Sequence, residues 1–125
     1  FKMTDALLAN QIPDALLLLD EILKKGFDAH LFINGLGAHF RDVLISKTPS
    51  TVGLLEVGEA TKAKYLEHAA KCPTAFLFGA IDIANQTDIQ YKSSKNPRLS
   101  VEIALMQMSS LLDPQGDLAK KKSIE

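Results

Sequence analysis

The chain has 125 residues, 46% of them hydrophobic and only 6% aromatic, which is enough for one domain with a core of mainly Leu, Ile and Ala. Its formal net charge is −1, from 14 basic and 15 acidic residues, which disfavours a domain that binds duplex DNA strongly on its own. Cys72 is the single cysteine, and no apolar run approaches the roughly 20 residues that span a bilayer, so we expect a cytoplasmic protein without a membrane partner.

The first half of the chain predicts three helices, because its apolar residues recur at spacings of three and four. Pro13 suits the first turn of the second helix, Gly26 suits its C-terminal stop, and Asp28 suits the N-cap of the third. Gly35 and Gly37 weaken the third helix by about 1 kcal/mol each relative to alanine, which a close approach of another helix would explain. The predicted helices span residues 2–9, 13–25 and 29–47, with apolar stripes at Leu16, Leu19 and Leu23 and at Phe32, Leu36, Phe40 and Val43.

The second half predicts three more helices, at residues 59–71, 75–92 and 97–112, after a short helical turn within 51–57. Alanines in the first of them favour tight packing, Thr74 suits an N-cap, and Pro97 starts the last helix. No stretch alternates apolar and polar residues as a strand would. We therefore expect an all-α fold, a compact bundle of five to six helices over residues 1–112. The polar residues 113–125 are expected to form a flexible tail or the start of a linker.

The last predicted helix carries two apolar stripes. They are Leu99, Ile103 and Met106 on one side and Val101, Leu105, Met108 and Leu112 on the other. A helix on the outside of a monomer needs only one apolar face. This helix is therefore either central in its own domain or shared with a neighbouring subunit, and the pattern leaves both readings open. Our candidate interface residues are Arg98, Leu99, Ile103 and Met106.

No pattern of a catalytic, cofactor or metal site stands out, so we assign no residue to any of these roles. The chain lacks the Gly-x-x-x-x-Gly-Lys-Ser/Thr loop that binds ATP phosphates, and one cysteine with three scattered histidines does not supply a zinc site. Glu67 and His68 are adjacent, whereas a di-iron bundle needs Glu-x-x-His. We interpret Cys72 as a small buried or surface thiol and His39 as a hydrogen-bonded packing residue.

Two groups of charged residues lie in the last helix or just before it. Arg98 and Glu102 are four residues apart and can form an exposed contact. A sharper hypothesis places Glu102 between the two stripes, where it is partly buried and paired with Arg98 or Arg41. Arg41 and Glu102 would then form a structural ion pair that orients the helix. Tyr91, Lys92, Lys95 and Arg98 form a small basic cluster that suits a solvated helix end, pairing with an acidic neighbour, or contact with nucleic acid.

Three segments in order resemble one protein family. Residues 4–28 look like the opening of the third domain of bacterial DNA polymerase III gamma/tau subunits. The segments His39-Phe40-Arg41-Asp42-Val43-Leu44 and Asn96-Pro97-Arg98-Leu99-Ser100-Val101-Glu102 resemble two further motifs of that domain. The match covers residues 1–112, and residues 51–57 look most like the Bacteroides-type version.

The resemblance implies a role in DNA replication. Members of this family are clamp-loader subunits, whose N-terminal AAA+ domains use ATP and Mg while the third domain joins the subunits into a collar. The chain is then a non-catalytic oligomerisation module without a cofactor, and its partners are the gamma/tau, delta and delta-prime subunits. The sliding clamp and primed DNA are reached only through the full assembly. Because the chain opens on Phe1 without an initiator methionine, we expect a piece of a longer subunit. A stand-alone helical nucleic-acid-binding or adaptor domain is the alternative.

Overall fold

The computed structural model describes residues 1–112, and all regular structure within that range is helical. In chain order the elements are α1 (Lys2–Leu8), α2 (Ile12–Lys24), α3 (Ala29–Ile45), α4 (Pro49–Val52), α5 (Glu59–Lys71), α6 (Thr74–Gln90), the 3-10 helix η1 (Tyr91–Ser93) and α7 (Pro97–Ser110). The all-α prediction is confirmed. The short helical turn expected within 51–57 is displaced, since α4 begins at Pro49 and ends at Val52. The predicted tail at 113–125 lies outside the described residues. None of the helices described has both the length and the apolar character needed to cross a membrane.

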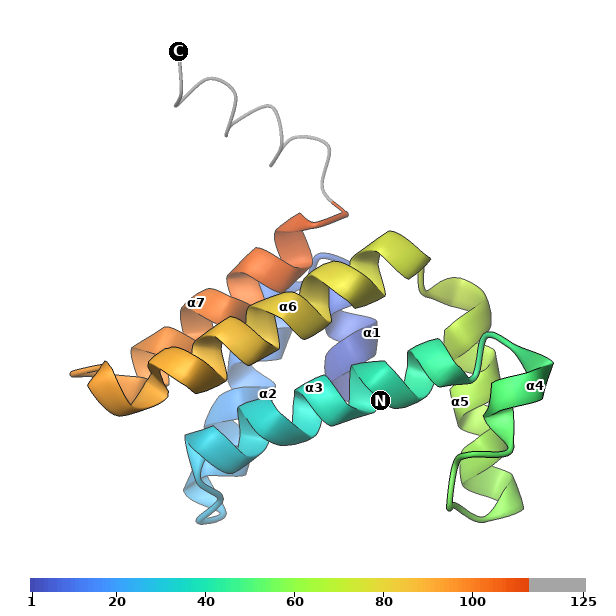
Figure 1. The fold of residues 1–125 in the computed structure, drawn as a ribbon. Helices are drawn as coiled ribbons and strands as arrows, with labels where there is room; N and C mark the ends of the chain where they lie inside the picture. Colours follow the sequence, from blue (N-terminus) through green and yellow to red (C-terminus); the bar gives the residue numbers. More distant parts are fainter. Residues whose placement is uncertain (113–125) are drawn as a thin grey trace.

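Helices α6 and α7 lie side by side and pack over α3 and α2 (Figure 1). The most extensive contact in the bundle is between α3 and α6, whereas α7 contacts α1, α2, α3 and α6. Helix α5 crosses the far end of α3 and packs against it there. One face of the last helix is therefore packed within its own domain.

Aromatic rings anchor the contact between α3 and α6. Phe40 and Phe76 are almost fully buried, and their rings meet edge to face with centroids 5.7 Å apart. Burying a side chain of this size contributes roughly 1.5–3 kcal/mol to folding. The stripe predicted for the third helix included Phe40 but omitted Ile33, which lies in the core. Phe76 also lies in the core, and the sequence analysis did not single it out.

The two glycines of α3 differ in their surroundings. A Cβ atom added at Gly37 would lie 3.2 Å from the Cβ of Ala84, so this glycine allows the close approach of α6. At Gly35 an added Cβ would have no neighbour within 4 Å. The expectation of a close helix contact is therefore confirmed for Gly37 and wrong for Gly35.

Turn residues end the early helices where the sequence predicts. Gly26 adopts a φ of 93°, a left-handed conformation that suits glycine, and Asn10 adopts a φ of 55° between α1 and α2. Asp28 occupies the N-cap of α3 but makes no capping hydrogen bond. Its carboxylate instead accepts a hydrogen bond from the hydroxyl of Tyr91 at 3.2 Å.

Two expectations for the middle of the chain are wrong. Pro73, not Thr74, is the N-cap of α6, since the extended backbone of Pro73 precedes a helix that begins at Thr74. The alanines of α5 do not provide tight packing, because Ala69 is the only one of them that is buried. Helix α5 lies at the end of the bundle, where only one of its faces reaches α3.

Candidate interaction surface on the last helix

The two stripes of α7 have opposite environments. Val101, Leu105 and Met108 are at most 1% exposed, so this part of the stripe is held in the core. Leu112, predicted in the same stripe, lies beyond the end of α7 and is 36% exposed. Leu99, Ile103 and Met106 are 48%, 44% and 39% exposed. The α7 stripe, as we call Leu99, Ile103 and Met106, thus forms an apolar row on the outside of a helix whose other face is fully packed.

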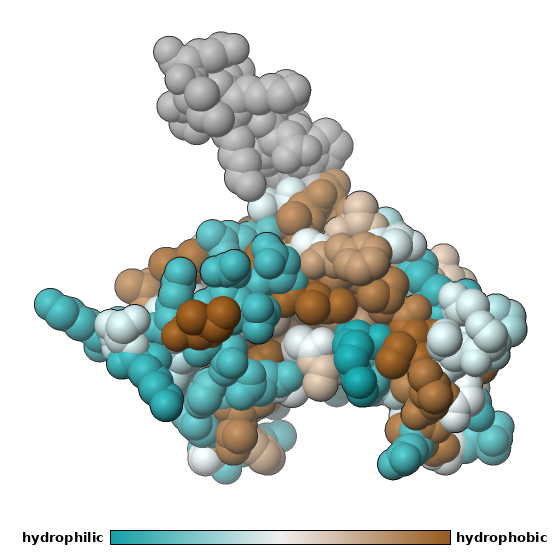
Figure 2. Space-filling model, in the orientation of Figure 1, coloured by the Kyte–Doolittle hydropathy of each residue, from teal (hydrophilic) through white to brown (hydrophobic). Residues whose placement is uncertain are grey.

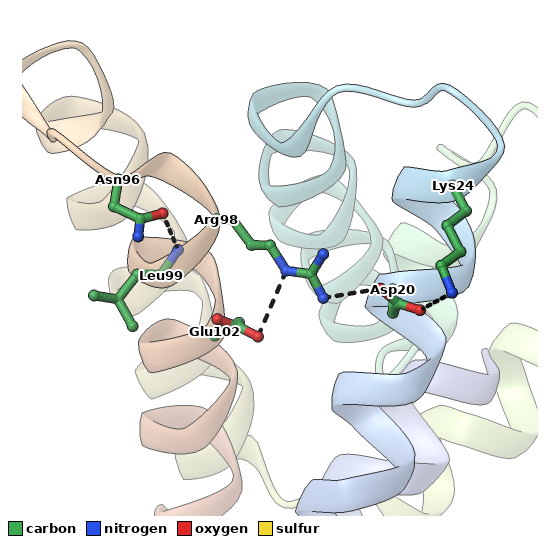
Figure 3. A network of polar contacts seen from close by, with 6 residues as sticks. All are labelled: Asp20, Lys24, Asn96, Arg98, Leu99 and Glu102. Carbon is green, nitrogen blue, oxygen red and sulfur yellow. Dashed lines mark hydrogen bonds and ion pairs between the residues drawn. The ribbon is translucent and has the colours of Figure 1, made fainter.

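Local interactions fix the start of α7 (Figure 3). The side-chain oxygen of Asn96 accepts a hydrogen bond from the backbone N–H of Leu99 at 3.1 Å, and Pro97 occupies the first turn. This is an N-cap of the kind that stabilises a helix by about 1 kcal/mol. Figure 3 shows the side chain of Leu99 pointing away from α2. The cap therefore gives the first residue of the α7 stripe a defined position.

Arg98 connects α7 to α2. Its Nη2 atom donates to Oδ1 of Asp20 at 3.0 Å, and its Nε lies 3.7 Å from Oε2 of Glu102 (Figure 3). Asp20 also pairs with Lys24 at 3.0 Å. Hydrogen bonds from Lys24, and then from Arg98, lower the pKa of the Asp20 carboxyl. Since these groups are accessible to solvent, the network orients α7 on α2 more than it stabilises the fold.

The proposed pairing of Arg41 with Glu102 is not formed. Arg41 donates to the neighbouring Asp42 at 2.9 Å and is largely exposed, beside a shallow cleft of about 290 Å³ between α3 and α6. Glu102 is partly buried, with 24% of its side chain exposed, but its partner is Arg98. The two residues fail to meet because Arg41 lies on the side of α3 that faces α6, whereas Glu102 lies on the α2 side of α7.

The basic cluster is partly used within the domain. Tyr91 stacks on His30 with ring centroids 4.4 Å apart, and His30 contacts Asp88 through its Nε2 atom. Because Tyr91 also bonds to Asp28, this group fastens the end of α6 to the start of α3. Arg98 is engaged by acids, whereas Lys92 and Lys95 are exposed. The arrangement fits a solvated helix end.

An aromatic and histidine cluster, which the sequence analysis did not predict, joins α1, α3 and α5. The Phe1 ring packs against His39, Tyr65 and His68, each with centroids 4.8–4.9 Å apart. His39 is hydrogen-bonded to Thr4 at 3.0 Å, as its packing role required. Burial, followed by the charges of the amino terminus and of His68, lowers the pKa of His39 to about 4. The imidazole is therefore neutral at neutral pH.

His68 completes this cluster at the junction of α1 and α5. It is buried, and its Nδ1 is hydrogen-bonded to the Lys64 carbonyl at 3.0 Å. Its Nε2 lies 3.1 Å from a carboxylate oxygen of Asp5 but is not aligned for a hydrogen bond. The hydrogen bond from Lys71 at 2.7 Å is the main cause of the lowered pKa of Asp5. The contacts of this group are internal and structural.

Reactive groups are few in the part of the chain that is described. No three His, Cys, Asp or Glu residues gather there to hold a metal ion. Cys72 is buried, and burial raises the pKa of its thiol, which disfavours the nucleophilic thiolate. The α7 stripe stays the candidate interaction surface among the described residues.

Comparison with known proteins agrees with the resemblance seen in the sequence. The family model for domain III of the DNA polymerase III subunits gamma and tau matches residues 1–121. The chain is 30% identical over 128 aligned residues to DNA polymerase III subunit tau of Bacillus subtilis (strain 168). This alignment covers 97% of the chain but 23% of the relative, so the chain spans less than a quarter of that protein. No solved structure matches the chain. The chain belongs to the family of domain III of the DNA polymerase III gamma and tau subunits.

Proposed function

We propose that this domain joins clamp-loader subunits into a ring and does so without chemistry of its own. Support comes from the family, whose members are subunits of DNA polymerase III, and from the exposed apolar row on α7. The ATP- and Mg-dependent steps then belong to AAA+ domains of the longer subunit. Gamma/tau, delta and delta-prime subunits are the proposed partners, and the sliding clamp and primed DNA are reached through the assembled loader. This role in replication places the protein in the bacterial cytoplasm.

The α7 stripe is the observation that carries the proposal. Leu99, Ile103 and Met106 recur at the spacing of one helix face, so their exposed parts form a row rather than scattered contacts. Apolar rows of this kind are typical of surfaces that bind another protein. Covering the row would remove apolar area from water, which is the main driving force of stable assembly.

Rigidity of α7 adds to its suitability as an interface. Its inner stripe is packed against α1, α2 and α3, its first turn is capped by Asn96, and Arg98 ties it to α2. A surface on such a helix loses little conformational entropy when it binds. In a ring of subunits, the same rigidity would hold the attached ATPase domains at a constant spacing.

The proposal is tested by placing a charge in the row. In a clamp loader assembled from full-length subunits, Ile103→Glu is expected to weaken assembly at least tenfold in sedimentation velocity, because a buried unpaired carboxylate is costly. Ile89→Glu on α6 is the matched control, since Ile89 is also exposed but lies outside the α7 stripe. Circular dichroism and melting confirm that both variants fold. Normal assembly of both Ile103→Glu and Leu99→Glu loaders would reject the interface.

Nucleic-acid binding by the domain alone is the competing function. It gains little from the structure, because Tyr91 and Arg98 of the basic cluster already bond within the domain. We expect the chain to show no salt-sensitive binding to single-stranded or primed DNA in fluorescence anisotropy between 50 and 200 mM salt, a range over which phosphate contacts lose affinity by on the order of 10³-fold. Strong binding that falls steeply with salt would favour the competing function.

A further inference from the structure

A groove of about 780 Å³ runs between α1, α2 and α3. Leu18 and Ile22 of α2 line it, whereas Asp20, between them, contacts Arg98 of α7. Helical residues two apart point to nearly opposite sides, so the groove lies on the side of α2 away from α7. Figure 2 shows the lower edge of the molecule hollowed between the α2–α3 corner and α5. The groove is therefore a surface separate from the α7 stripe.

Two helices form the walls of the groove. Leu18 and Ile22 of α2 are four residues apart, and Leu31, Gly35 and His39 of α3 follow one another at the same spacing. Residues at this spacing share one helix face, so each wall is a continuous face, and the wall on α3 spans about two turns. A trough between two helix faces is a shape that receives an amphipathic helix of another protein.

The groove is apolar and open. Phe27 and Leu31 line it and are 60% and 66% exposed, so it presents apolar area that nothing within residues 1–112 covers. A small-molecule site would enclose most of its ligand, which an open groove does not do. Gly35 also lines the groove, and an added Cβ there would meet open space, so internal packing gives no reason for glycine. A missing side chain in the wall lets the backbone of an incoming helix approach closely.

The charges that line the groove are mostly positive. They belong to Lys2, Lys25 and Lys64, against one acid, Glu21. All three lysines are exposed, and none of them pairs with a carboxylate within residues 1–112. Free ammonium groups around apolar area favour a partner that carries carboxylates beside its apolar residues. Nucleic acid fits less well, because aliphatic walls offer no hydrogen bonds to base edges.

We propose that the groove binds an acidic amphipathic helix of a partner protein. The apolar face of this helix packs on Phe27 and Leu31, its backbone passes over Gly35, and its carboxylates meet the surrounding lysines. The α7 stripe of a second copy does not fit this description, since it contains no charge. The inference goes beyond the proposed function, because the partner binds apart from the α7 stripe and takes no part in joining the subunits.

Two stapled helical peptides of roughly 14 residues, about four turns, serve as probes. They share leucines at spacings of three and four, and one carries glutamates beside the leucines where the other carries lysines. In fluorescence anisotropy, the acidic probe is expected to bind the full-length subunit about tenfold more tightly than the basic probe and to lose affinity as salt is added. Equal binding of the two probes would overturn the inference.

Reversal of the groove charges shows where the probe binds. The double variant Lys25→Glu with Lys64→Glu is expected to reverse the preference, so that the basic probe binds more tightly than the acidic one. The control, Lys92→Glu with Lys95→Glu, changes the net charge equally at exposed lysines outside the groove and should leave the preference as it was. Equal effects of the two double variants would mean that the probes respond to net charge, and the inference fails.

Filling the groove supplies the second test. Gly35→Leu is expected to weaken binding of the acidic probe about tenfold while circular dichroism shows a folded protein, because the leucine occupies the path of the helix backbone. Gly53→Leu, at another open glycine outside the groove, should have no effect. Undiminished binding of the acidic probe to the Gly35→Leu subunit would contradict the inference.

The assembled clamp loader distinguishes this inference from the proposed function. It is expected to bind the acidic probe as tightly as the free subunit does, because the groove and the α7 stripe are separate surfaces. If assembly blocks the probe, a neighbouring subunit covers the groove, and the inference fails while the proposed function stands. If the probe binds as expected but Ile103→Glu and Leu99→Glu loaders assemble normally, the α7 interface fails and the inference stands.

Discussion

The guanidinium group of Arg98 lies 3.0 Å from the carboxylate of Asp20 and so links the first turn of α7 to α2 (Figure 3). The neighbouring residue, Leu99, begins the exposed stripe. A contact between two solvent-accessible ions contributes little stability, but this one joins the start of α7 to α2. The same residue therefore positions the stripe without being part of the core.

Replacement of Arg98 by alanine should distinguish an effect on the orientation of α7 from an effect on the thermal stability of the domain. We expect the melting temperature of Arg98→Ala to stay within about 2 °C of the parent, because exposed pairs contribute little. Assembly of the loader should weaken by roughly two- to fivefold, the equivalent of one such pair. Sedimentation and thermal melting measure the two effects, and Arg98→Lys should recover part of the assembly. A large loss of melting temperature with normal assembly would contradict this role.

Much of the helical pattern was predictable because its signals are local. Pro97 fits the first turn of α7, and Gly26 at φ 93° ends α2, since each residue type restricts or permits a backbone conformation by itself. Spacing alone also showed that α7 has two apolar faces. The sequence could likewise place Glu102 near Arg98, because residues four apart share a helix face.

Relations between helices could not be predicted in the same way. Gly35 and Gly37 are two residues apart in one helix. They differ only because α6 brings Ala84 close to Gly37 and leaves Gly35 open. Arg41 was matched with Glu102 although nothing in the sequence says which side of α3 faces α7. Phe76 was omitted because the pattern of α6 allowed more than one apolar face. Packing selects among such faces, and packing depends on contacts between distant parts of the chain.

The two glycines of α3 supply a stability prediction. Gly35→Ala should raise the free energy of unfolding by about 0.5–1 kcal/mol, because alanine has the higher helix propensity and its methyl group meets open space. Gly37→Ala gains the same propensity but places a Cβ 3.2 Å from Ala84, so its net effect should be near zero or destabilising. Urea unfolding measures both. An equal gain from both substitutions would show that α6 does not approach α3 closely.

The aromatic contact at the centre of the core predicts a large effect. Phe40→Ala should lower the free energy of unfolding by about 3–5 kcal/mol, since Phe40 is fully buried and the cavity beside Phe76 cannot close completely. Phe78→Ala removes the same ring from a side chain that is 61% exposed and should change stability by less than about 0.5 kcal/mol. Chemical denaturation of the pair gives the difference. Similar losses for both would place Phe40 outside the core.

The cap of α7 is tested at Asn96. Asn96→Ala removes the acceptor for the Leu99 N–H and should cost about 1 kcal/mol of stability, whereas Asn96→Asp keeps an acceptor and should cost less. Hydrogen exchange gives the local readout, because fraying should be confined to the first turn of α7. Unchanged exchange at Leu99 in Asn96→Ala would mean that the cap does not hold this turn.

Protonation of His39 predicts how stability depends on pH. Its pKa falls from 6.5 to about 4 on folding, mainly because the imidazole is buried, so the unfolded chain binds a proton more readily. Stability is therefore complete above pH 6.5 and decreases as the pH falls from 6.5 towards 4. Because the ring is partly exposed, we expect a loss of about 1–2 kcal/mol between pH 7 and pH 5. Urea unfolding at pH 7, 6 and 5 measures it.

A His39→Gln variant isolates this contribution, since glutamine keeps a polar group near Thr4 but does not titrate. Its free energy of unfolding should vary less between pH 7 and pH 5 than that of the parent, even if its value at pH 7 is lower. Asp5 does not complicate the comparison, because its lowered pKa confines its own effect to pH values below about 4. Parallel pH profiles for parent and variant would show that His39 is not held neutral by the fold.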